Sequence, residues 1–232
     1  MGKTIEIKAL HGDATFSAYC AEPAADAKAA IIVIQEIFGV NPGIRQKCDE
    51  WAAKGYLALA PDIFWRSEPG VELDADVPEE FQKGVDLMMK LDQNIAIEDI
   101  EATIRAARGL TGGGKVGAVG YCLGGRLAFM VAARTDINAT VGYYGVGIDN
   151  LLGESHAIAH PLMLHIPTSD GFVPAEIQAK MHEGLDGHPK VTLHDYPGLD
   201  HGFAAAMGNR RNDEAAKLAD GRTEAFFAAH LV

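Results

Sequence analysis

A Gly-x-Cys-x-Gly motif centred on Cys122 is the part of this sequence whose residue types are best suited to chemistry. It follows a short apolar run that begins at Val116, and a helix-like segment over residues 126–134 comes directly after it. This arrangement is typical of a nucleophile elbow, in which Gly120 and Gly124 permit a tight strand-to-helix turn, with cysteine where serine is usual. The motif predicts a nucleophilic thiol; the alternative is a structural cysteine in a glycine-rich turn.

A thiol nucleophile needs a base, and the base needs an acidic group that orients it. Asp170 follows a predicted strand that ends at Ile166, and His201 lies in the loop after a predicted strand over residues 191–196. In α/β-hydrolases these groups occur in the order nucleophile, acid, histidine, each just after a strand. Cys122, Asp170 and His201 have this order, so we predict that they form a catalytic triad. Considered singly, each residue also has a simpler interpretation. Asp170 is then a turn-forming residue, and His201 is an exposed loop residue.

Acyl transfer also needs N–H donors for the oxyanion that forms on the attacked carbonyl group. We predict two backbone donors by position: Leu123, which follows the cysteine, and Ile37, in the loop after a predicted strand over residues 29–34. Glu36 precedes Ile37, although a carboxylate so near a catalytic centre costs desolvation energy. Two interpretations of Glu36 stay open: a solvated loop charge, or a carboxylate in contact with the thiol or with the predicted base.

Alternating strands and helices are expected to position these residues. Residues 4–10 and 15–20 are typical of an N-terminal β-hairpin, and the later strands are buried apolar runs separated by amphipathic helices. The pattern predicts a single domain over residues 1–232 with an α/β fold, a mostly parallel sheet of about eight strands with helices on both faces. Residues from about 63 to 94, acidic at their start, are expected to form an excursion, a segment that passes over the top of the domain near the active site.

Composition and charge exclude several classes of protein. The chain has 232 residues, 48% of them hydrophobic, and a formal net charge of −12 without a basic stretch, so we expect neither nucleic acid nor a membrane as partner. It has no apolar run of transmembrane length and no signal-peptide core. Cys20, Cys48 and Cys122 are few and widely spaced, which favours a cytoplasmic location. No spacing typical of a metal site occurs, and we expect no metal.

The sequence resembles the dienelactone hydrolase (carboxymethylenebutenolidase) family of the α/β-hydrolase superfamily. The resemblance rests on segments spread through nearly the whole chain, residues 35–39, 60–62, 115–125, 141–145, 172–174 and 201–203, together with Asp170. It implies the α/β-hydrolase fold and a Cys–His–Asp triad made of Cys122, His201 and Asp170, without a cofactor. It also implies that Glu36 hydrogen-bonds the resting thiol and helps to activate it when substrate arrives.

Substrate identity is the point at which the sequence departs from the family pattern. Dienelactone hydrolases of the chlorocatechol pathway are expected to hold the substrate carboxylate with two arginines, yet no arginine occurs over residues 67–104. The candidate replacements are Arg66, Lys83, Arg210 and Arg211. We expect a hydrolase of a small ester or lactone that acts through an acyl-cysteine, as a monomer or small homo-oligomer. The alternatives are an inactive small-molecule binding protein of the same fold, or thioester or peptide cleavage by the same three residues.

Overall fold

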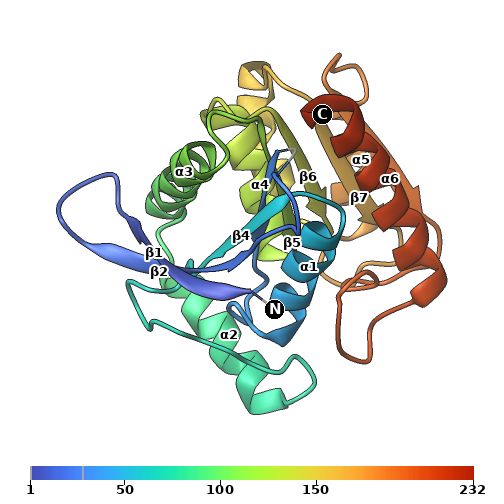
Figure 1. Ribbon diagram of the computed structural model, residues 1–232. Coiled ribbons are helices and arrows are strands. Elements are labelled where there is room, and N and C mark those ends of the chain that lie inside the picture. The colour runs from blue at the N-terminus through green and yellow to red at the C-terminus, as the bar shows by residue number, and fades with distance from the viewer. Residues whose placement is uncertain (1, 28) are drawn as a thin grey trace.

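The centre of the molecule is one sheet of eight strands, found within residues 2–27 and 29–232, the part of the chain that the computed structural model describes (Figure 1). The strands are β1 (Lys3–Lys8), β2 (Thr15–Ala21), β3 (Ala30–Ile34), β4 (Leu57–Pro61), β5 (Val116–Tyr121), β6 (Ala139–Tyr143), β7 (Leu162–Pro167) and β8 (Val191–Tyr196). Their order is β1-β2-β4-β3-β5-β6-β7-β8. β2 pairs antiparallel with β1 and β4, whereas all pairs from β4 to β8 are parallel. The predicted mostly parallel sheet with an N-terminal hairpin is confirmed.

Six α-helices and one 3₁₀-helix occur among the described residues. They are α1 (Pro42–Ala53), α2 (Pro78–Lys90), α3 (Gln93–Leu110), α4 (Leu123–Arg134), the 3₁₀-helix η1 (Ile148–Ala157), α5 (Ala175–Leu185) and α6 (Asp213–Leu231). Side chains of α1 and α6 pack on one face of the sheet, and those of α3, α4 and α5 pack on the other. Within the described part of the chain, no helix combines the length and the apolar character needed to cross a membrane.

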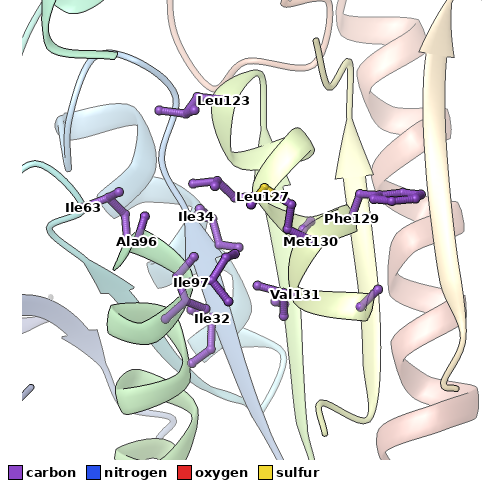
Figure 2. Close-up of a cluster of buried hydrophobic side chains, with 14 of the residues drawn as sticks. Ile32, Ile34, Ile63, Ala96, Ile97, Leu123, Leu127, Phe129, Met130 and Val131 are labelled. Atoms are coloured by element: carbon purple, nitrogen blue, oxygen red, sulfur yellow. The ribbon is translucent and has the colours of Figure 1, made fainter. Parts of the chain in front are cut away.

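A cluster of buried aliphatic side chains fills the space between the sheet and the helices α3 and α4. Figure 2 shows Ile97 of α3 and Leu127 of α4 converging on Ile32 and Ile34 of β3. Every residue of β3 and β5 is buried, as expected of parallel strands that are covered on both faces. Burial of each such isoleucine or leucine contributes about 1.5–3 kcal/mol to stability. This packing fixes the carboxyl ends of β3 and β5, which carry the candidate site.

The excursion expected over about residues 63–94 is anchored to the sheet at its start. The carboxylate of Asp62 accepts a hydrogen bond from the N–H of Gly70 at 2.7 Å. The N–H of Leu73, whose side chain is buried, donates to the carbonyl of Phe38 at 2.9 Å. The excursion therefore lies against the loop that follows β3, and α2 extends from it.

Two local features differ from the expectation. Helix α4 begins at Leu123, directly after the cysteine, and not at Arg126. The glycines in its first turn have low helix propensity and hide this start in the sequence. The segment after residue 145, expected as a loop, contains η1, a 3₁₀-helix of 10 residues for which the sequence carries no strong periodic signal.

Candidate active site

Cys122 lies in a strained turn between β5 and α4. Its backbone angles, φ 53° and ψ −112°, are rarely adopted by a residue other than glycine. A Cβ atom on Gly120 would overlap the carbonyl oxygen of Gly124, and a Cβ on Gly124 would overlap that of Ile34. Glycine is therefore required at both positions of the motif. The turn leaves the sulfur partly exposed at the N-terminus of α4, where the helix dipole favours negative charge.

Asp170 and His201 meet beside this turn, although they are far apart in the sequence. Nδ1 of His201 lies 2.9 Å from Oδ2 of Asp170, and the two residues are only 6% and 5% exposed. The other oxygen of Asp170 accepts the N–H of Phe172 at 2.8 Å. Asp200 joins the two loops, because its Oδ1 accepts the N–H of Gly171 at 2.9 Å and that of His201 at 2.7 Å.

The imidazole of His201 is held between Asp170 and the sulfur of Cys122. Burial alone would lower the pKa of His201, but the charge of the Cys122 sulfur and the hydrogen bond to Asp170 outweigh it and raise the pKa from 6.5 to about 10. The rings of Tyr144 and Phe172 pack edge-on against the imidazole, each with a centroid distance of 4.9 Å. These contacts fix the plane of the ring and point it at the sulfur.

Two backbone N–H groups of the cavity wall lack a hydrogen-bond partner on the backbone of the described residues. Neither the N–H of Ile37 nor that of Leu123 makes a backbone hydrogen bond within the described chain. The Leu123 N–H is unpaired because it belongs to the first turn of α4. Both residues line the same cavity as Cys122, so their N–H groups are available to a ligand oxygen.

Glu36 lies on the cavity wall and is half-buried. Loss of hydration raises the pKa of its carboxyl group, while the nearby charges of His201 and Lys47 partly offset this effect. The buried Tyr144 hydroxyl is also near this carboxylate, but it has no partner at hydrogen-bond distance among the described residues. Glu36 is therefore near the predicted base, and its hydrogen bond to the thiol stays a prediction.

A cavity of about 410 Å³ opens above Cys122 and His201. This volume is in the range of small-molecule sites. Apolar side chains of α2 form one wall, and the segment over residues 202–210 forms another. The α2 residues are Phe81, Val85 and Met88. Nowhere in the described ranges do three or more His, Cys, Asp or Glu side chains gather as they would around a metal ion.

The sequence model of the dienelactone hydrolase family matches residues 16–231. The chain belongs to the dienelactone hydrolase family. A carboxymethylenebutenolidase of Pseudomonas putida is 37% identical over 225 residues, which cover 97% of this chain and 95% of that protein. A protein of Azospirillum brasilense, provisionally named a carboxymethylenebutenolidase, is 48% identical over 222 residues, 94% of this chain and 95% of its own.

Solved structures agree with this assignment. A protein of Klebsiella pneumoniae, provisionally named a dienelactone hydrolase, superposes with a TM-score of 0.84 at 28% identity, over 98% of this chain and 99% of that chain. The predicted α/β-hydrolase fold is confirmed, and the chain is a hydrolase of the dienelactone hydrolase family.

The four cations considered as carboxylate anchors for a dienelactone hydrolase have different surroundings. Three of them are engaged away from the cavity: Arg66 with Asp99 at 2.8 Å, Lys83 with Glu68 at 2.6 Å and Arg211 with Asp213 at 2.7 Å. Arg210 lines the cavity beside His201, and its guanidinium carbon lies 5.5 Å from the ring centre of Phe172. No ion pair of Arg210 is found in the described part of the chain.

Lys47 is a further charged residue of the cavity wall that the sequence analysis missed. Its side chain is buried, and Nζ pairs with Asp220 of α6 at 3.0 Å. The burial of Lys47 could have been predicted from the sequence. Lys47 has helical spacing with Ile44 and Trp51, and so belongs to the buried face of α1. A lysine on such a face needs a buried partner.

Proposed function

We propose that the chain hydrolyses a small ester or lactone through an acyl-cysteine intermediate. The observation that supports this most is the position of His201, which lies between the Asp170 carboxylate and the Cys122 sulfur at the base of the cavity. A histidine whose pKa is raised beside a cysteine sulfur is what an imidazolium–thiolate pair requires. Family membership favours an enzyme over an inactive binding protein with the same fold.

In the acylation step, the Cys122 thiolate attacks the carbonyl carbon of the substrate. The electron pair of the C=O bond moves to the oxygen, and the N–H groups of Ile37 and Leu123 stabilise the oxyanion. The intermediate then collapses, the bond to the leaving oxygen breaks, and the His201 imidazolium donates its proton to that oxygen. The product is a thioester on Cys122 and a neutral imidazole.

In the deacylation step, His201 acts in the opposite direction. The neutral imidazole takes a proton from water, and the resulting hydroxide attacks the thioester carbonyl. Collapse of the second oxyanion releases the carboxylic acid and restores the thiolate and the imidazolium. Asp170 holds the ring through Nδ1 during both steps, so that Nε2 faces the reacting atoms.

We further propose that the substrate carries a negative charge next to an apolar body. The apolar α2 side chains suit the body, and Arg210 is the arginine on the cavity wall that has no carboxylate partner at ion-pair distance in the described chain. A planar guanidinium binds a carboxylate through two parallel hydrogen bonds. The relatives named carboxymethylenebutenolidases favour an enol-lactone of this kind. The cytoplasmic location and the monomeric or small homo-oligomeric state stay predictions.

Hydrolysis of an activated aryl ester by the Cys122→Ala variant tests the proposed function. The variant is expected to lose at least about a thousandfold in kcat, because no other group can form the covalent intermediate. Cys48→Ala is the matched control, since Cys48 is a buried cysteine of α1 outside the cavity, and it should retain kcat. Mass spectrometry of the wild type, stopped during turnover, should show the acyl group on Cys122. Wild-type turnover by Cys122→Ala would refute the proposed function.

A further inference from the structure

Gln35 is a completely buried amide at the point where β3 ends, with an exposed fraction of 0%. Its Nε2 donates to the carbonyl oxygen of Glu36 at 3.2 Å, and its Oε1 accepts the N–H of Ile63 at 3.1 Å. The side chain therefore joins the loop after β3 to the segment that follows β4. None of the steps proposed above uses Gln35.

The Glu36 carbonyl and the Ile37 N–H belong to the same peptide group. The peptide bonds in the described residues are all trans, and in a trans peptide the C=O and the N–H point in opposite directions. A hydrogen bond that holds the carbonyl on one side thereby holds the N–H on the other. Because Gln35 is completely buried, its hydrogen bond holds the carbonyl on the interior side. The Ile37 N–H is then on the opposite side, and Ile37 lines the cavity.

The next peptide of the same loop, between Ile37 and Phe38, is held in place by contacts with the excursion over residues 63–94. A Cβ on Gly84 of α2 would lie 2.7 Å from the carbonyl oxygen of Ile37, so the helix backbone is in direct contact with that peptide. The next carbonyl, that of Phe38, accepts the N–H of Leu73 at 2.9 Å. Residues 37–38 form a turn, and the Gln35 amide is the side-chain group that hydrogen-bonds the carbonyl of the Glu36–Ile37 peptide itself.

We propose that Gln35 is a positioning residue of the oxyanion hole, which acts by fixing the plane of the Glu36–Ile37 peptide. This inference rests on the proposed function, because it assumes that the Ile37 N–H binds the oxyanion. Loss of the Gln35 donor frees the peptide to tilt, and an N–H that is tilted away stabilises the oxyanion less. The effect is on the transition state, so kcat should fall while KM changes little.

The Gln35→Met variant tests this role, because methionine has a similar length and neither a donor nor an amide acceptor. With an activated aryl ester, kcat is expected to fall about 10- to 100-fold, with KM within about threefold of the wild type. The second readout is the rate at which iodoacetamide alkylates Cys122. Alkylation displaces iodide at a saturated carbon and forms no oxyanion, so this rate should stay within about twofold of the wild type.

Thr103→Val provides the control for a general loss of stability. Thr103 is fully buried in α3, and its hydroxyl bonds the Asp99 carbonyl at 2.8 Å, away from the cavity. This variant should lower the melting temperature without lowering kcat. If Gln35→Met does not fold, Gln35→Asn replaces it, since its shorter amide cannot reach both partners, and it is expected to lose at least about fivefold in kcat.

The outcomes separate the inference from the proposed function on which it rests. Wild-type kcat in the folded Gln35 variant, or a loss of kcat matched by an equal loss in alkylation rate, overturns the role of Gln35. If the role of Gln35 is overturned in this way but Cys122→Ala is inactive in the same assay, the proposed function still holds. If Cys122→Ala keeps its turnover, the proposed function fails, whatever Gln35→Met does.

Discussion

Two groups of cavity-lining residues are built in different ways, and we call them the reacting wall and the substrate wall. The reacting wall, which contains the residues proposed to react, Cys122, Leu123, Ile37 and His201, depends on backbone groups packed so closely that a Cβ on Gly124 has no space. The substrate wall, α2 and residues 202–210, is made of side chains that are partly exposed, such as Met207 at 55%. A change on the reacting wall therefore disturbs the chemistry of any substrate, whereas a change on the substrate wall alters which substrate is preferred.

Asp170→Asn should produce the largest effect in this comparison, because the residue supports the reacting wall. An amide in place of the carboxylate no longer holds the correct tautomer of His201 and no longer stabilises its charged form. We expect kcat to fall on the order of a thousandfold for anionic and neutral aryl esters alike. Asp200→Asn is the matched control, since its remaining amide oxygen still accepts the two backbone N–H groups, and it should lose less than about threefold. Equal losses in the two variants would contradict the role given to Asp170.

The protonation of His201 tests the electrostatic coupling within the reacting wall. In the wild type the imidazole should titrate near its raised pKa of about 10, and be charged at pH 8. Cys122→Ala and Cys122→Ser both remove a negative charge that favours the imidazolium, so in each the pKa should fall toward the ordinary 6.5. Nitrogen-15 NMR of labelled histidine measures this change. A His201 pKa that is the same in all three proteins would contradict the ion pair.

Arg210→Gln should show the smaller and more selective effect that is expected of the substrate wall. Loss of a charge-assisted hydrogen bond should raise KM about tenfold for an aryl ester that carries a carboxylate. A neutral aryl acetate should stay within about twofold, because it has no charge to bind. Lys83→Gln, a charge change outside the cavity, is the control for long-range electrostatics. An equal increase in KM for both esters would remove Arg210 as a carboxylate anchor.

The fold was predictable, and so was the edge of the sheet at which Cys122, Asp170 and His201 lie, because local patterns mark the strand ends. Buried apolar runs that stop at glycine or a turn located the carboxyl ends of β5 and β7, and the Pro-Gly turn after Tyr196 located that of β8. Such ends meet at one edge of a parallel sheet. The 2.9 Å contact of Asp170 and His201 agrees with this expectation. Asn41 and Pro42 indicated the start of α1, and the Asn41 side chain does accept the N–H of Ile44.

The details of the substrate wall were not predictable, because they depend on contacts between distant segments. Arg210 lies in an irregular segment without periodicity, so only its packing near Phe172 shows that it lines the cavity. Lys47 pairs with Asp220, a residue far away in the sequence. The role inferred for Gln35 depends on the direction of one peptide group, and no pattern of residue types records that direction.

The chain order of the reacting groups also bears on protein synthesis. Cys122 follows β5, in the middle of the sheet, whereas His201 follows β8, which is the edge strand and the last to leave the ribosome. Domains fold during synthesis from their N-terminal part onward. Until β8 has joined the sheet, Cys122 lacks the histidine that we propose as its base. On the proposed function, a chain that lacks β8 and the loop after it therefore lacks the base, and reactivity towards esters arises only at the end of assembly.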